Sequence, residues 1–507
     1  MASVRQISFR FFLGKLLAHR LPPRGKVQVN FLLRRSVALG GIEALMRIPL
    51  VFATGFLARR LGSLDYGQWT VVLAFHAIVF SLASVGLSSA LSRYAASATP
   101  KSALGMLIFA LASCFIVLAL LAFPILAFRY SLAAIIGLPS AAASLIACGL
   151  LLVLAQTAES LLDAYFKARE LVVRQALFQF LRTAVDVVVI VTVFSRISPD
   201  VRDDHISAVL EYVVIAAIAK AVVYPLLLLG IGHGAQTPDA AVRRNMLHIG
   251  LPLIPGAILL ALLYQEDRLI LGHFLEPQAL GIYAFAAALA AYLHSVGTVS
   301  YAMLLPRLSL FYDQGSPNEL AKLIDLSQQL FLDLIGPVLV CLALLGTEIA
   351  VLLAGPSYAS AGPLLLLLGT GVAIDRLFGP YGLVFYLVKR SYWITGLHAV
   401  ACLSLAIGVV IGARFGGASG AAWGVVAASV CNNLLRAYIC RRFIALQPSP
   451  ALWRSIVLTV GAIMLAAALA NHLEMPARLF LASLSALYAA RAIVRLRQDD
   501  ELIRRPA

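Results

Sequence analysis

The sequence predicts an all-helical protein that crosses a membrane about fourteen times and contains two related halves. Three observations lead to this fold class. Apolar residues make up 61% of the 507 positions, whereas charged residues make up only 13%. Apolar runs of about 20 residues, long enough to cross a bilayer, recur along the chain. One polar pattern also occurs twice, once in each half.

The hydropathy of the chain excludes a soluble protein. Its mean hydropathy of +0.91 is well above that of soluble domains. A large soluble helical protein would need long polar segments between the apolar runs, and the sequence has none. We therefore expect membrane-spanning helices near residues 36–60, 67–92, 104–128, 142–166, 172–195, 206–231, 246–274, 280–304, 325–346, 361–387, 391–413, 418–440, 454–472 and 477–494.

An internal repeat relates the two halves. Gly67 corresponds to Gly281 and Arg93 to Arg307, and each pair is 214 positions apart. The same ungapped alignment matches four more residues in steps of three and four, which places them on one helical face. These are Ala74, Ala77, Ser81 and Val85, matched with Ala288, Ala291, Ser295 and Val299. Two halves built on one plan and buried in lipid are typical of a transporter.

These features divide the chain into five parts. Residues 1–35 form a basic N-terminal arm, either an interfacial helix or a disordered segment, because basic residues interrupt its short apolar stretch. The first half occupies 36–232 and the second half 246–443. Two further spans follow at 454–495, and residues 496–507 form a tail.

The net charge of +16 reports membrane topology and not nucleic-acid binding. With the N-terminus inside, the predicted cytoplasmic segments hold about 27 of the 40 basic residues, as the positive-inside rule requires. Both termini are then cytoplasmic. The basic loops are expected to contact anionic lipid heads, and no nucleic-acid partner is expected.

The sequence offers little support for an enzyme. Its nine histidines are scattered, with no pair at metal-ligand spacing, and no Gly-rich phosphate loop is present. The loops between the predicted spans are short, at most about 15 residues. An enzyme that acts on sugars outside the membrane would be expected to have a large loop with its acid, base or nucleophile. We therefore expect no catalytic activity, no metal and no cofactor.

Charged residues inside the predicted spans are the candidate functional residues, because each costs about 3 kcal/mol or more unless it is paired or hydrated. The basic candidates for a substrate-binding cavity are Arg47, Arg182, Lys220, Arg268 and Arg376. The acidic candidates for coupling to a proton or sodium gradient, or for counter-ions, are Glu43, Asp186, Asp267, Asp333 and Asp375.

Two interpretations of these charges remain open. Glu43 and Arg47, like Arg182 and Asp186, are four residues apart and could neutralise each other within the bundle. The depth of Arg47, Lys220, Arg268 and Arg376 instead favours a hydrated cavity between the halves. Several guanidinium groups suit an anionic substrate, because the planar fork binds phosphate oxygens at two points.

Four motifs, in order along the chain, resemble those of the polysaccharide transporter (oligosaccharide flippase) family. The first half has Arg60-Leu61-Gly62 followed by Tyr66-Gly67, similar to a family turn. The other motifs are Gly250-Leu251-Pro252 with Asp267-Arg268, Leu271-Gly272 and Leu280-Gly281-Ile282-Tyr283; Leu305-Pro306-Arg307-Leu308-Ser309; and the Gly355–Tyr358 segment before a later span.

The resemblance implies membership of the multidrug/oligosaccharidyl-lipid/polysaccharide exporter (MOP) superfamily. Its fold has two six-helix lobes, with two extra helices in many glycan transporters. The implied activity is movement of an undecaprenyl-pyrophosphate-linked oligosaccharide to the outer leaflet of the bacterial inner membrane, by alternating access around a basic cavity. The implied partners are the lipid-linked glycan, membrane lipids, and polysaccharide polymerase and export proteins.

Alternative functions come from the same superfamily and from other classes. A drug/cation antiporter of the superfamily would have twelve helices and prefer cationic substrates, whereas this chain has two more predicted spans and a basic interior. A membrane glycan polymerase or glycosyltransferase would need a long outer loop. A purely structural scaffold would leave the charges within the spans without a purpose.

Overall fold

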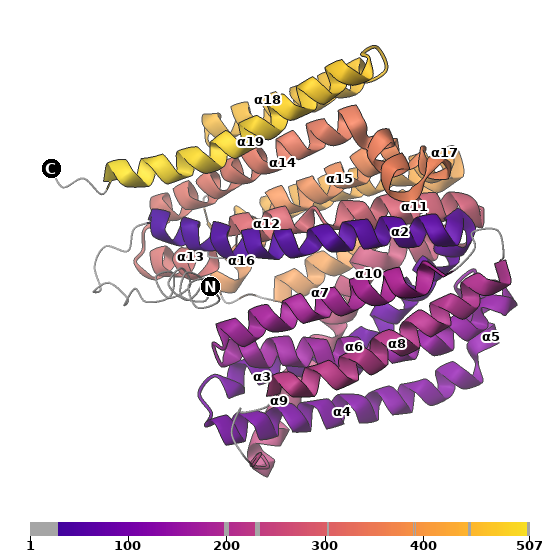
Figure 1. Cartoon of the computed structure of the whole chain (residues 1–507). Coiled ribbons are helices and arrows are strands. Elements are labelled where there is room, and N and C mark those ends of the chain that lie inside the picture. Colours follow the sequence, from indigo (N-terminus) through magenta and orange to yellow (C-terminus); the bar gives the residue numbers. More distant parts are fainter. Residues whose placement is uncertain are drawn as a thin grey trace, which may run out of the picture.

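The structure is a helical bundle in which the C-terminal helices lie along one edge (Figure 1). The computed structural model describes residues 29–196, 202–228, 234–301, 304–388, 390, 392–444 and 448–503. Most of the predicted N-terminal arm and the last residues of the predicted tail lie outside this range. Every regular element within it is a helix.

Within the described residues, the first half consists of one long helix, six shorter α-helices and one 3-10 turn. In chain order the helices are α2 (Val29–Ala83), α3 (Leu87–Ala95), α4 (Pro100–Ala127), α5 (Arg129–Ile135), η1 (Ser140–Ala142), α6 (Ala143–Ala168), α7 (Val172–Phe194) and α8 (Arg202–Leu228).

The second half and the C-terminal pair follow. Their helices are α9 (Ala240–Gly250), η2 (Leu251–Leu253), α10 (Ile254–Leu271), α11 (Pro277–Ala291), α12 (His294–Tyr301), α13 (Leu304–Asp313), α14 (Pro317–Ala354), η3 (Pro356–Tyr358), α15 (Ala361–Leu377), α16 (Gly379–Leu387), α17 (Tyr392–Cys440), α18 (Pro450–Leu469) and α19 (Met475–Ile503). Helices α18 and α19 both pack against α14.

The predicted fold class is confirmed. Eleven segments of the described chain are long and apolar enough to cross a membrane. Two of them contain an internal break, at Gly62 in α2 and at Gly416–Gly417 in α17, so each forms two spans. With these divisions and the addition of α19, the structure has about fourteen spans, in agreement with the sequence-based expectation.

Local sequence signals explain where several helices begin. Proline occupies the first helical position of α4, α11, α14 and α18, where its missing N–H has no intrahelical partner to lose. Two of these helices also have a hydroxyl cap. Thr99 Oγ1 accepts a hydrogen bond from Ser102 N (3.3 Å), and Ser449 Oγ accepts one from Leu452 N (3.0 Å).

Breaks within the spans occur at glycine and proline. Gly62 adopts a φ of 70°, a left-handed conformation that glycine tolerates without strain, and it joins the first two spans without a loop. A 3-10 turn at Leu251–Leu253 separates α9 from α10, and a break at Phe378 precedes Gly379-Pro380. In contrast, α14 continues through Pro337.

The two repeat-related glycines contact each other where α2 crosses α11. A Cβ on Gly67 would lie 2.6 Å from the carbonyl oxygen of Pro277, and a Cβ on Gly281 would clash with the carbonyl oxygen of Ser63. Residues 63 and 277 are also 214 positions apart, so the two contacts are reciprocal. The helices therefore cross at backbone contact on the axis that relates the repeats. We call this contact the glycine crossing.

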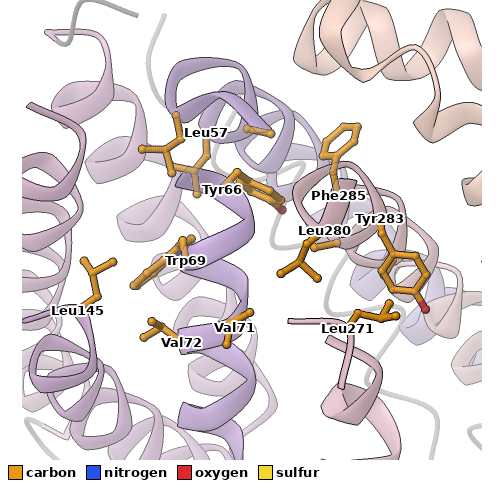
Figure 2. Close-up of a cluster of buried hydrophobic side chains, with 14 of the residues drawn as sticks. Leu57, Tyr66, Trp69, Val71, Val72, Leu145, Leu271, Leu280, Tyr283 and Phe285 are labelled. Atoms are coloured by element: carbon orange, nitrogen blue, oxygen red, sulfur yellow. The ribbon is translucent and has the colours of Figure 1, made fainter. Parts of the chain in front are cut away.

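An aromatic cluster lies next to the glycine crossing in sequence, at the end of the bundle predicted to face outward. Figure 2 labels two of its members, Tyr66 and Phe285. Tyr66, Phe285 and Tyr358 are all buried, and their rings meet edge to face with centroids 4.9–6.4 Å apart. The hydroxyl of Tyr358 donates a hydrogen bond to the carbonyl of Ala58 (3.1 Å). The two halves are therefore joined here by a packed core.

Replacement of Gly281 by alanine should separate this crossing. The added Cβ meets backbone, which cannot move aside as a flexible side chain could, so we expect a loss of about 1–3 kcal/mol in stability. The melting temperature of the detergent-purified protein measures the effect. Gly461→Ala is the matched control, because no atom lies within 4 Å of its added Cβ. Equal melting temperatures for the two variants would contradict tight backbone contact at the crossing.

Candidate functional site

The charged residues of the first half form a compact ion cluster. Lys220 on α8 places its Nζ 2.8 Å from Glu159 Oε1 on α6 and 2.7 Å from Asp186 Oδ1 on α7. Arg182 Nη1 lies 3.9 Å from Glu159 Oε2, and the hydroxyl of Tyr224 donates to Glu159 Oε1 (2.6 Å). We call Glu159, Arg182, Asp186 and Lys220 the first-half ion cluster.

This cluster balances its own charge. It contains two basic and two acidic groups, and the side chains of Lys220 and Glu159 are only 9% and 11% exposed. Ion pairs at that depth compensate the cost of desolvation only when their geometry is good. Arg182 and Lys220, both predicted to bind substrate, are therefore already engaged by carboxylates.

Arg47 lies where α2 of the first half meets the second half. It is close enough to Tyr292 to interact with it electrostatically. The hydroxyl of Tyr292 is hydrogen-bonded to Thr54 Oγ1 (2.8 Å) and also donates to the carbonyl of Leu50 (3.4 Å), which ties the end of α11 to α2. The side chain of Glu43, predicted as the partner of Arg47, lies outside the described residues.

Asp267 and Arg268 are adjacent in α10 but do not form a salt bridge. Asp267 Oδ1 accepts from the backbone N of Arg268 (2.8 Å), and Oδ2 accepts from the hydroxyl of Tyr283 (3.0 Å). The guanidinium of Arg268 donates to Gln265 Oε1, and its buried Nε has no partner in the described structure. Arg268 is only 9% exposed, so this positive charge is buried with no carboxylate at salt-bridge distance among the described residues.

Asp375 and Arg376, adjacent in α15, likewise bond to different partners and not to each other. Asp375 accepts hydrogen bonds from Asn433 Nδ2 (2.5 Å) and Ser429 Oγ (3.3 Å), both on α17. Arg376 points elsewhere: its Nε donates to His294 Nδ1 (2.7 Å) and its Nη2 to the hydroxyl of Tyr264 (3.1 Å). Successive residues of a helix diverge by about 100°, so an acid and a base in sequence need not neutralise each other.

The remaining predicted residue lies apart from both groups. Asp333 on α14 accepts a hydrogen bond from the hydroxyl of Tyr488 on α19 (3.1 Å). It therefore takes part in the contact between α14 and the C-terminal pair. No group of acidic, histidine and cysteine side chains suited to a metal ion occurs in the described residues.

The structure adds residues that the sequence analysis did not select. Glu159 is the centre of the first-half ion cluster. In the sequence, only its position one turn before Asp163 pointed to it. Arg436 on α17 donates its Nη1 to Asn433 Oδ1 (2.9 Å), within the group around Asp375. A spacing of three from Asn433 could have identified it, but its position close to Arg441 and Arg442 resembles the basic end of a span.

Removal of the central cation tests the first-half ion cluster. Lys220→Met leaves Glu159 and Asp186 buried without their main partner, so we expect a loss of about 3–5 kcal/mol in stability. Lys167→Met is the control, because the Lys167–Asp163 pair is short (2.6 Å) but Lys167 is 57% exposed and such pairs contribute at most about 1 kcal/mol. Melting temperature and membrane abundance measure both effects. Similar losses in the two variants would contradict a buried cluster.

Comparisons with known proteins agree on family and fold. Residues 42–311 match a family model described as "polysaccharide biosynthesis protein". The chain is similar to an inward-facing multidrug resistance MATE family transporter of the MOP superfamily, with a TM-score of 0.61 and 14% identity over 79% of this chain and 98% of that one. No match was found among curated protein sequences.

Two further solved structures share this fold. The lipid II flippase MurJ in an inward closed conformation has a TM-score of 0.58 and 12% identity, over 94% of this chain and 100% of that one. The Vibrio cholerae MATE transporter VcmN in its bent form has a TM-score of 0.53 and 16% identity, over 84% and 97% of the two chains.

Proposed function

The chain belongs to the polysaccharide biosynthesis protein family, and we propose that it moves a polyprenyl-diphosphate-linked oligosaccharide across the bacterial inner membrane. One observation supports this substrate most strongly. Arg268, Arg376 and Arg436 have no carboxylate within salt-bridge distance in the part of the chain that the structure describes. A guanidinium inside a membrane protein is costly unless water or an anion accompanies it.

A diphosphate is an anion that suits these residues. The planar guanidinium fork binds phosphate oxygens at two points, more strongly than a neutral donor would. Beside Arg376, the 43%-exposed ring of Tyr264 offers an apolar face of the kind on which sugars stack. The second half thus combines arginines that suit the diphosphate with an aromatic ring that suits the first sugars. The polyprenyl tail would remain in lipid.

The same observation weighs against a drug/cation antiporter. An organic cation would meet three guanidiniums in the second half, whereas Asp267 and Asp375 accept hydrogen bonds from neutral donors. In the first half, the acids Glu159 and Asp186 are occupied by Lys220. A cationic substrate would therefore have to displace a lysine before it reached a carboxylate.

Alternating access is the mechanism that we propose for this transport. Rocking of two similar halves exposes a shared site to each side in turn. The Tyr292 bonds to Thr54 and Leu50 join the two halves, so they would break and reform in each cycle. In this proposal both termini are cytoplasmic, a proton or sodium gradient drives transport, and polymerase and export proteins take up the product.

Loss of the protein should cause its substrate to accumulate. In cells from which the gene is deleted, we expect a polyprenyl-diphosphate-linked oligosaccharide to build up on the inner face of the inner membrane while surface polysaccharide falls. Extraction of lipid-linked glycans followed by mass spectrometry measures both. Accumulation of unpolymerised repeats on the outer face would instead indicate a polymerase, and unchanged lipid-linked glycans would contradict the proposal.

Replacement of one guanidinium should impair transport without loss of the protein. Arg376→Gln removes the charge but keeps a polar side chain, and a hydrogen bond to a charged group contributes about 1.5–3 kcal/mol, so we expect about a 10- to 100-fold lower transport rate. Restoration of surface polysaccharide in the deletion strain measures this. Arg129→Gln, at a partly exposed arginine that contacts Tyr130, is the control. A parallel fall in activity and membrane abundance would show that Arg376 is structural.

A further inference from the structure

We propose that Arg376 and Arg436 form a two-cation site in which each guanidinium binds one phosphate of a lipid diphosphate, with Asn433 as the positioning residue for Arg436. This inference rests on the proposed function and deepens it, because it states which residues distinguish a diphosphate from a monophosphate. The site lies where α10, α12, α15 and α17 meet.

Asn433 connects Arg436 to Asp375. It is fully buried, and its Nδ2 donates to Asp375 Oδ1 (2.5 Å) and to the carbonyl of Ser429 (2.8 Å). Its Oδ1 accepts from Arg436 Nη1 (2.9 Å). The amide can lie only this way round, because its nitrogen faces a carboxylate and its oxygen faces a guanidinium. Asn433 therefore orients Arg436 while it keeps Asp375 from forming a salt bridge with it.

Arg376 is oriented from the other side by neutral groups. Its Nε and Nη2 donate to His294 and Tyr264, which leaves three of its five N–H donors without a protein acceptor in the described structure. Helix α12 passes close to it: a Cβ on Gly297 would lie 2.8 Å from Arg376 Cδ. The absence of a side chain at residue 297 thus gives the arginine room, and the guanidinium is held between α10 and α12.

Hydrogen bonds bring Arg436 close to Arg376, because Asn433 bonds both Arg436 Nη1 and Asp375 Oδ1, and Asp375 directly precedes Arg376 in α15. Asp375 interacts with both, but its oxygens accept from Asn433 and Ser429. Two positive charges therefore share one carboxylate, which neither of them contacts directly. Like charges repel in a protein interior, and an anion that lies between them relieves the repulsion. A diphosphate places one phosphate group opposite each guanidinium.

The binding of simple prenyl phosphates to the purified full-length protein tests the site. The probes are farnesyl diphosphate, farnesyl monophosphate and inorganic pyrophosphate, and isothermal titration measures each dissociation constant. We expect farnesyl diphosphate to bind the wild-type protein most tightly. Arg436→Gln should weaken diphosphate binding about 10- to 100-fold and leave monophosphate binding nearly unchanged, whereas Arg376→Gln should weaken both.

Two more variants separate positioning from folding. Asn433→Ala should lower the preference for diphosphate over monophosphate, because Arg436 loses its acceptor, and Arg436→Lys should retain part of that preference. Arg414→Gln is the matched control, because Arg414 is an exposed arginine of the same helix whose guanidinium lies over the ring of Phe274. It should leave all three dissociation constants unchanged.

The following results would contradict the two-cation site or the lipid substrate. An equal loss for both prenyl phosphates in Arg436→Gln, or no loss for either, would show that Arg436 does not bind a second phosphate. Inorganic pyrophosphate that binds as tightly as farnesyl diphosphate would indicate a soluble ligand instead of a lipid. If the diphosphate preference depends on Arg436 but the deletion strain accumulates no lipid-linked glycan, the two-cation site stands and the oligosaccharide proposal fails.

Discussion

The contact between Gly67 and Gly281 sets the geometry on which the rest of the structure depends. Each glycine lets the other helix approach until backbone meets backbone, and any side chain at either position would prevent this. The contact is reciprocal because the two positions are equivalent in the repeat. It brings the aromatic cluster of Tyr66, Phe285 and Tyr358 together, and it places the helices that bear Arg47 and Arg268 side by side.

The two halves share a helical plan but treat charge differently. In the first half, Lys220 joins Glu159 and Asp186, so basic and acidic groups from three helices neutralise one another. In the second half, the acids adjacent to Arg268 and Arg376 turn toward neutral donors, and the guanidiniums keep their full charge. The first half thus neutralises its charges through direct ion pairs, whereas Arg268 and Arg376 of the second half bond to neutral groups in the described structure.

The sequence predicted the membrane fold well and the site only in part. Span positions follow from apolar run length, and the repeat from aligned glycines, so both can be read without three-dimensional information. A spacing of four residues can reveal only pairs within one helix. In the structure, Arg182 instead pairs with Glu159, and Asp186 pairs with Lys220, both on other helices. Arg436 was missed because its neighbours in sequence resemble a cytoplasmic end, whereas its guanidinium bonds the buried Asn433, which in turn bonds Asp375 of α15.

The contact between α14 and α19 has a consequence for any shortening of this chain. Glu348 of α14 forms a 2.6 Å ion pair with Arg478 of α19, Cys341 lies 3.2 Å from Ser485, and Tyr488 donates to Asp333. Removal of α18 and α19 would take away Arg478, the ion-pair partner of Glu348. Truncation before α18 would also uncover the face of α14 that the C-terminal pair covers, so the rest of the bundle depends on this pair.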